Sequence, residues 1–211
     1  NSCYGCNNSC RNCKIMSIFT LLSRVVRAIV TEKITSVVVA KAMPKEDTVT
    51  DLPWMAEGKR VLGLHETTNN STLKKWLGSD GHALGDPSKL PWCGDFAETC
   101  IRLGLPKETL VANPYLAYNW LKFGKAVKPQ YGAILVFHRG DAKSTLGHIG
   151  FYVGESATHY YVLGGNQGNM VSVSPMPKTK LRPSGARWPV TGPMQTDKTI
   201  AMSGGTVTSV T

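Results

Sequence analysis

The spacing of apolar residues changes near Lys128, and this change constrains the fold more than any other feature of the chain. Before it, apolar residues recur at helical spacing, in segments that end at glycines. After it, short segments rich in β-branched and aromatic residues are separated by turns that contain Gly or Ser. These segments are residues 131–138, 147–154, 159–166 and 170–175. Helices followed by a run of adjacent strands predict an α+β fold with an antiparallel sheet.

Four helices are expected before the strands, within residues 53–64, 69–81, 91–104 and 113–124. The third, "PWCGDFAETCIRLG", carries the clearest signals. Its acidic residues Asp95 and Glu98 lie near the start, where the helix dipole favours negative charge. Gly104, followed by Pro106, ends it. Asp95 is therefore interpreted as a first-turn helix residue and not as a catalytic acid.

The chain of 211 residues suits one packed domain with extensions. A polar, turn-rich stretch, "PKEDTVTD", ends an N-terminal segment of residues 1–50. Continuous apolar periodicity defines the domain itself, residues 51–190. Residues 191–211 are small, polar and rich in Gly, Ser and Thr, which predicts a flexible or attachment tail.

The N-terminal segment has apolar residues at helical spacing between residues 15 and 42, interrupted by charged side chains. A membrane span needs about 20 predominantly apolar residues, so none is predicted here. The internal charges also argue against a secretory signal. The pattern predicts an amphipathic helix that lies on a membrane surface, packs on a partner protein, or covers the protein's own core.

Four of the six cysteines, Cys3, Cys6, Cys10 and Cys13, form two C-x-x-C pairs. Such pairs can bind zinc or an iron-sulfur cluster, but zinc modules usually separate them by a dozen or more residues. Only three residues intervene here. A thiol-rich segment without metal, reduced inside a cell or disulfide-linked outside it, is the favoured interpretation over a structural zinc.

The net charge of +10 and the pI of about 9.4 favour an anionic partner such as nucleic acid, anionic lipid or an acidic cell-wall polymer. The chain has no aromatic and basic RNA-binding motif, zinc-finger spacing or basic leucine repeat. Nucleic acid is therefore not expected as a partner.

The two remaining cysteines differ in their place on the third predicted helix. Cys93 falls at or just before the first turn, where free backbone N–H groups and the helix dipole stabilise a thiolate. Cys100 lies two turns further along, on an apolar stripe, where a buried thiol behaves as a small hydrophobic group. Cys93 is thus the candidate nucleophile, provided that a base lies near it.

His148 is the candidate base. In "GHIGFYVG", strand alternation places His148 and Gly150 on one face, and the glycine leaves room for another backbone to approach. A solvent-satisfied histidine at the end of a strand is the alternative interpretation of this segment taken alone.

The turn "ESATH" allows the strand after it to pair antiparallel with the strand of His148. If Gly154 faces Tyr160, then Tyr152 faces Val162, and His148 faces Asn166. Opposed side chains lie close enough for the asparagine amide to hydrogen-bond the imidazole. The chain therefore offers Cys93, His148 and Asn166 as nucleophile, base and orienting group.

The motifs "PWCGDF", "GHIGFYVGE" and "VLGGNQGN", in this order and spacing, resemble papain-like cysteine hydrolases of the CHAP and NlpC type. The resemblance spans residues 53–189 and is closest to small phage and bacterial members that cleave peptidoglycan. It implies a papain-like α+β fold, with N-terminal helices and the nucleophile helix packed on an antiparallel sheet. It also implies Cys93 as nucleophile, His148 as general base and Asn166 as the third polar residue.

The resemblance implies hydrolysis of an amide in the peptide part of peptidoglycan, as an endopeptidase or an N-acetylmuramoyl-L-alanine amidase. In such a mechanism His148 would keep Cys93 as a thiolate, with no cofactor required. The backbone N–H of Cys93, with Gln167 or the surroundings of Asp95, is a candidate for oxyanion stabilisation. Trp92 either lines a substrate groove or packs beneath the helix.

These expectations fit a phage-encoded endolysin or a virion-associated enzyme that acts at the bacterial cell wall or periplasm. Residues 15–42 would then bind other virion proteins or a membrane surface. A structural virion or wall-binding protein that keeps the fold without activity is one alternative. A zinc amidase is another, with ligands among five residues that lack the spacing of an H-E-x-x-H helix. These are His65, Asp80, His82, Asp86 and His138.

Overall fold

The computed structural model describes residues 51–193. The predicted amphipathic helix within residues 15–42, the four cysteines of the N-terminal segment and the tail beyond residue 193 lie outside the described residues. The helices are α2 (Pro53–Arg60), α3 (Asn70–Leu77) and α4 (Cys93–Gly104), with short 3-10 helices η1 (Ala117–Lys122) and η2 (Lys178–Lys180). The strands are β1 (Lys125–Ala126), β2 (Ile134–His138), β3 (Gly147–Glu155), β4 (His159–Gly164), β5 (Ser172–Pro177) and β6 (Leu181–Trp188).

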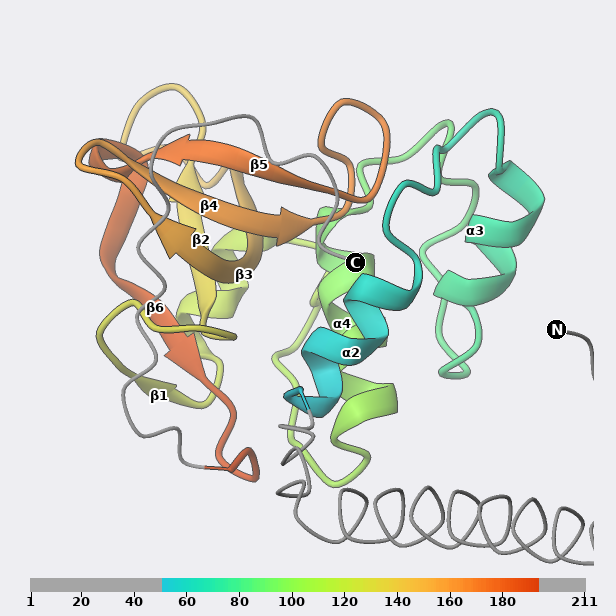
Figure 1. The fold of residues 1–211 in the computed structure, drawn as a ribbon, viewed down its shortest axis with the longest axis horizontal. Helices are drawn as coiled ribbons and strands as arrows, with labels where there is room; N and C mark the ends of the chain where they lie inside the picture. Colours follow the sequence, from blue (N-terminus) through green and yellow to red (C-terminus); the bar gives the residue numbers. More distant parts are fainter. Residues whose placement is uncertain (1–50, 194–211) are drawn as a thin grey trace, which may run out of the picture. The chain divides into compact units, whose positions relative to one another are not determined.

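The strands form one six-stranded sheet in the order β1-β6-β2-β3-β4-β5, and each neighbouring pair is antiparallel. In Figure 1, α2 and α4 lie side by side next to this sheet, and α4 contacts β3 and β4. The predicted α+β fold with an antiparallel sheet is therefore confirmed. No helix in the described part of the chain is long and apolar enough to cross a membrane.

Two features of the fold depart from the sequence prediction. The expected helix within residues 113–124 is a single 3-10 segment, because Pro114 and Asn113, which has a φ of 50°, break the chain before it. Strand β6 was not predicted, since its sequence "LRPSGARW" contains Pro and Gly and lacks regular alternation. Pairing with β2 and β1 nevertheless makes β6 an inner strand of the sheet.

The apolar side of α4 forms the centre of the core. Phe96, Cys100 and Ile101 are fully buried, as are Ile149 and Phe151 on the facing side of β3. The rings of Phe96 and Phe151 lie 6.0 Å apart in a tilted arrangement. Burial of each large side chain contributes roughly 2 kcal/mol to stability, so this contact strongly fixes the position of α4 on the sheet.

Glycines allow the N-terminal end of α4 to approach its neighbours closely. A Cβ on Gly94 would lie 2.3 Å from the carbonyl oxygen of Pro114 and 2.8 Å from the Cα of Tyr115. A Cβ on Gly165, in the loop after β4, would lie 2.5 Å from the ring of Trp92. Only a residue without a side chain fits at these points, so the first turn of α4 is held between two loops.

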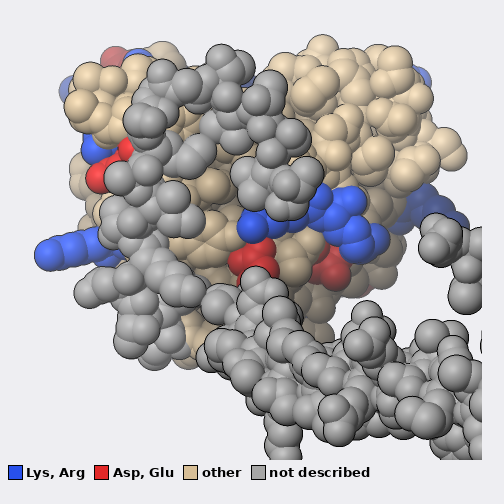
Figure 2. Space-filling view, viewed as in Figure 1, with Lys and Arg blue, Asp and Glu red and all other residues tan. Residues whose placement is uncertain are grey.

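Charged side chains of both signs lie next to one another over α2 on the face drawn in Figure 2. Two ion pairs account for this pattern, Lys59 with Asp51 at 2.8 Å and Arg60 with Glu57 at 2.6 Å. Basic residues in this part of the surface are therefore locally neutralised.

The close approach at Gly94 predicts a large effect of a single methyl group. Gly94→Ala is expected to lower the free energy of unfolding by roughly 3 kcal/mol, because backbone atoms of the 113–115 loop must move away from α4. Gly78→Ala is the matched control, since a Cβ there meets only ordinary contacts, the closest at 3.6 Å. Urea denaturation followed by circular dichroism measures both changes, and equal stability of the two variants would contradict the tight packing of α4.

Candidate active site

Cys93 is the first residue of α4, at the position predicted for a nucleophile. Its side chain is 5% exposed. Burial raises the pKa of the Cys93 thiol, while backbone N–H groups of Ile149, Gly94 and Cys93 itself and the charge of Arg139 partly oppose this increase. Because the burial effect is the largest, the thiol is neutral at rest.

The contact between Cys93 and β3 links the nucleophile to the candidate base. The backbone N–H of Ile149 lies close enough to the sulfur of Cys93 to lower the pKa of the thiol, and Ile149 directly follows His148. Packing of the apolar side of α4 on Ile149 and Phe151 sets this position. Cys93 and Ile149, the residue directly after the candidate base, are thus brought together although they lie far apart in the chain.

His148 is almost fully buried, with 2% of its surface exposed. Its Nε2 lies 2.9 Å from Oε1 of Gln167, and its Nδ1 is buried without a hydrogen-bond partner among residues 51–193. Burial lowers the pKa of His148 to about 4; the hydrogen bond to Gln167 opposes this shift, and the charge of Arg139 adds to it. The imidazole is therefore neutral at physiological pH.

Gln167 determines which nitrogen of His148 carries the proton. Its amide nitrogen donates to the carbonyl oxygens of Val162 at 3.1 Å and Ser172 at 2.6 Å, so Oε1 must point to the imidazole. Nε2 of His148 is then the donor, which leaves the lone pair of Nδ1 free to accept a proton. Gln167 was predicted as an oxyanion donor; in the structure its side-chain amide nitrogen instead donates to two carbonyl oxygens.

The hydrogen bond predicted between Asn166 and His148 is replaced by the one from Gln167. The predicted pairing of Tyr152 with Val162 is confirmed, but Gly154 pairs with Tyr161 and not with Tyr160, because of an irregularity in the ladder between Tyr152 and Gly154. Strand β4 ends at Gly164.

The loop after β4 then turns through Asn166, whose φ of 56° lies in the left-handed region. This turn gives the position next to the imidazole to Gln167, whose longer side chain reaches Nε2. Asn166 lines the same pocket as His148 without making that bond.

Trp92 and Cys100, the neighbours of Cys93 that were considered above, pack in the core of the domain. Trp92 is fully buried, and its indole N–H donates to Glu66 Oε2 at 2.9 Å, so it packs beneath the helix and does not line a groove. Cys100 is also fully buried, and burial raises its pKa well above the usual value. Its predicted role as a small hydrophobic residue of the core agrees with this position.

Asp95 lies in the first turn of α4, as predicted, and is buried. Burial raises the pKa of Asp95 to about 7; the backbone N–H of Leu84 opposes the shift, and the nearby carboxylates of Glu98 and Asp80 add to it. Arg102 is shared between these carboxylates, with its Nε 2.8 Å from Glu98 and 3.7 Å from Asp80. The cluster supports the side of α4 that faces the 80–84 loop.

No group of three or more His, Cys, Asp or Glu side chains with the geometry of a metal site occurs within residues 51–193. His65, His82 and His138, the histidines considered for a zinc amidase, do not form such a group with Asp80 or Asp86. The possible zinc or disulfides at Cys3, Cys6, Cys10 and Cys13 fall outside the described residues.

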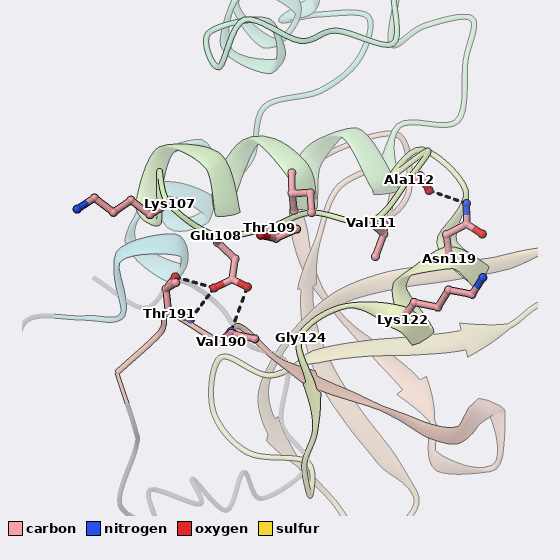
Figure 3. Close-up of a pocket in the computed structure, with 11 residues that line it drawn as sticks. Lys107, Glu108, Thr109, Val111, Ala112, Asn119, Lys122, Gly124, Val190 and Thr191 are labelled. Carbon is pink, nitrogen blue, oxygen red and sulfur yellow. Dashed lines mark hydrogen bonds between the residues drawn. The ribbon is translucent and has the colours of Figure 1, made fainter.

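A pocket of about 310 Å³ opens beside the imidazole. Its lining residues are Arg139, His148, Asn166, Gln167, Gly168, Ser174 and Met176. A second pocket, of about 400 Å³, lies between the loop after α4, the η1 region and the end of β6, and it includes none of the candidate site residues. There, Glu108 points toward Val190 and Thr191 and accepts hydrogen bonds from both backbone N–H groups (Figure 3).

The Cys93 thiol at the start of α4 therefore lies against the backbone of the residue that follows His148, and the imidazole of His148 has a defined tautomer and an orienting amide. This arrangement can take a proton from a nucleophile and return it to a leaving group. No family model, curated protein or solved structure matches the chain.

The buried, neutral imidazole predicts a loss of stability in acid. The pKa of His148 is about 4 in the folded chain and 6.5 when unperturbed, so the unfolded state binds the proton first as pH falls. Lowering the pH from 7 to 4.5 should therefore remove about 2 kcal/mol of unfolding free energy through this group.

The variant His148→Gln should lose less unfolding free energy between pH 7 and 4.5, because its side-chain amide does not titrate. His82→Gln, at an exposed histidine, should lose as much as wild type. Urea denaturation of the three proteins at the two pH values measures the effect. Parallel pH dependences of wild type and His148→Gln would contradict the buried neutral state.

Proposed function

We propose that this chain is a papain-like cysteine hydrolase of the CHAP and NlpC type that cleaves an amide bond in the peptide part of peptidoglycan. One observation carries the proposal. The thiol at the start of α4 lies close enough to the backbone N–H of Ile149 for that group to lower its pKa, next to a histidine whose Nδ1 is free and whose Nε2 is held by Gln167. The motifs "PWCGDF", "GHIGFYVGE" and "VLGGNQGN", on which the family resemblance rests, supply these groups.

In the proposed reaction, Nδ1 of His148 accepts the proton of the Cys93 thiol as the sulfur attacks the amide carbonyl. The imidazolium then protonates the leaving amine, and a thioester links the acyl group to Cys93. Water, deprotonated by the same nitrogen, hydrolyses the thioester and restores the thiol. Gln167 serves as the positioning residue that holds the ring, a role that the sequence had suggested for Asn166.

The pKa values of the two reacting groups favour a neutral pair before substrate binds. Burial raises the pKa of Cys93 and lowers that of His148, so proton transfer accompanies the attack on the carbonyl. This differs from the stored thiolate expected from the helix-start position alone. The developing oxyanion would be bound by the backbone N–H groups of Cys93 and Gly94, which precede the first hydrogen bond within α4.

The biological setting follows from the same resemblance. A phage endolysin or a virion-associated enzyme would act at the bacterial cell wall or periplasm, as an endopeptidase or an N-acetylmuramoyl-L-alanine amidase. The net charge of +10 would favour long-range attraction to anionic wall polymers.

A structural virion or wall-binding protein that keeps the fold without activity is the second candidate. The observation in its favour is the low exposure of the two reacting side chains, 5% for Cys93 and 2% for His148. A substrate must displace neighbouring side chains or loops to reach them. A folded wild type that binds peptidoglycan without cutting it would select this candidate.

Digestion of purified peptidoglycan, with product masses read by mass spectrometry, tests the proposed function. Cys93→Ala is expected to abolish release of products, because the other cysteine within residues 51–193, Cys100, is fully buried in the core. Cys100→Ala is the matched control on the same helix and should retain activity, with only reduced stability from the cavity that it leaves. Equal digestion by wild type and Cys93→Ala would refute the cysteine mechanism, and loss on chelation without loss on thiol alkylation would select a zinc amidase.

The choice between Gln167 and Asn166 as positioning residue gives a separate prediction. Gln167→Ala should reduce kcat by about 10- to 100-fold, because the imidazole loses its fixed tautomer, and Asn166→Ala should have a much smaller effect. Gln167→Glu places a carboxylate beside the ring and should raise the pKa of His148, which moves the acidic limb of the pH–rate profile upward. An unmoved limb, or a larger loss in Asn166→Ala, would contradict this assignment.

A further inference from the structure

The pocket beside His148 has a distinctive charge. Among its lining residues, Arg139 is the only charged side chain at neutral pH, and none is Asp or Glu. Arg139 directly follows β2, whose last residue, His138, pairs with Gly147 at the start of β3. This pairing explains why a residue nine positions before His148 lies at the same pocket.

The Arg139 guanidinium has no hydrogen-bond or ion-pair partner among residues 51–193, although the backbone N–H of Arg139 binds the carbonyl of Leu146. The other four arginines of this region are all occupied. Arg60 and Arg102 pair with carboxylates, and Arg182 and Arg187 donate to backbone carbonyl oxygens. Arg139 is thus the one arginine of the described domain that is available to a ligand.

The surroundings of Arg139 indicate what kind of ligand it takes. A guanidinium presents two parallel N–H donors that match the two oxygens of a carboxylate. Peptidoglycan stem peptides contain free carboxylates close to several of their amide bonds. We propose that Arg139 binds a substrate carboxylate in the pocket beside His148, and so selects amide bonds that adjoin a residue with a free carboxylate.

This inference rests on the proposed function, and it adds a link between binding and chemistry. The positive charge of Arg139 lowers the pKa of His148 and of Cys93 in the free protein. A bound carboxylate neutralises that charge, so the imidazolium that forms during the attack becomes less unfavourable. The same neutralisation raises the pKa of the Cys93 thiol, so the preference for substrates that carry the carboxylate comes from binding to Arg139.

Alkylation of Cys93 tests the carboxylate subsite without requiring hydrolysis. Iodoacetate carries a carboxylate and iodoacetamide does not, and peptide mass spectrometry distinguishes label on Cys93 from label on the buried Cys100. In wild type the ratio of the iodoacetate rate to the iodoacetamide rate should exceed that of Arg139→Gln by about threefold to tenfold. Arg139→Lys, which keeps the charge without the paired donors, should lie between them.

Arg60→Gln is the matched control, since it removes the same charge from the α2 surface, near Cys100 and not Cys93. Its alkylation ratio should equal that of wild type. An unchanged ratio in Arg139→Gln, or an equal fall in Arg60→Gln, would overturn the proposal. Circular dichroism of each variant checks that the exposed substitutions leave the fold intact.

Hydrolysis of paired peptides separates this inference from the proposed function. The two peptides differ only in a carboxylate or a carboxamide on the residue next to the scissile amide. Wild type should cleave the carboxylate form with the higher kcat/KM, and Arg139→Gln should lose the preference. If Arg139→Gln keeps the preference for the carboxylate peptide and cleavage still depends on Cys93, the role of Arg139 is refuted and the proposed hydrolase function stands. If wild type cleaves neither peptide nor peptidoglycan but its alkylation ratio still depends on Arg139, the hydrolase function is refuted and the carboxylate subsite stands.

Discussion

The contact of the first turn of α4 with β3 is the interaction on which the rest of the structure depends. The apolar stripe of the helix packs on Ile149 and Phe151, and Gly94 and Gly165 let two loops close around its start. The sulfur of Cys93 then meets the backbone of Ile149. Since protein interiors are close-packed, a shift of the helix along the sheet would separate the thiol from the histidine.

Burial is the second constraint, because it sets the charge state of the site. A buried thiol and a buried imidazole are both disfavoured in their charged forms, so the pair is neutral at rest. Gln167 satisfies one nitrogen of His148, and its own amide is satisfied by two carbonyl groups. This network fixes the tautomer of the ring, leaving Nδ1 as the only imidazole nitrogen that can accept a proton.

Two sets of charged side chains have different roles in the domain. The carboxylates of Asp80, Asp95 and Glu98 lie near one another, where Arg102 and a raised pKa at Asp95 limit their repulsion. Arg139 stands at the pocket beside His148 without a partner in the described domain. The first group has a supporting role at the helix start, and the second leaves a positive charge available to an anionic substrate.

The sequence by itself determined the fold class, the helix start at Cys93, the separation of Cys93 from Cys100, and the pairing of Tyr152 with Val162. These depend on local spacing and on the two-residue period of strands. Tertiary structure decided that Gln167 and not Asn166 binds His148, that β6 joins the sheet, and that both reacting groups are buried and neutral. An irregular ladder, a left-handed loop residue and burial by distant segments cause these outcomes, and none of them has a local signal in the sequence.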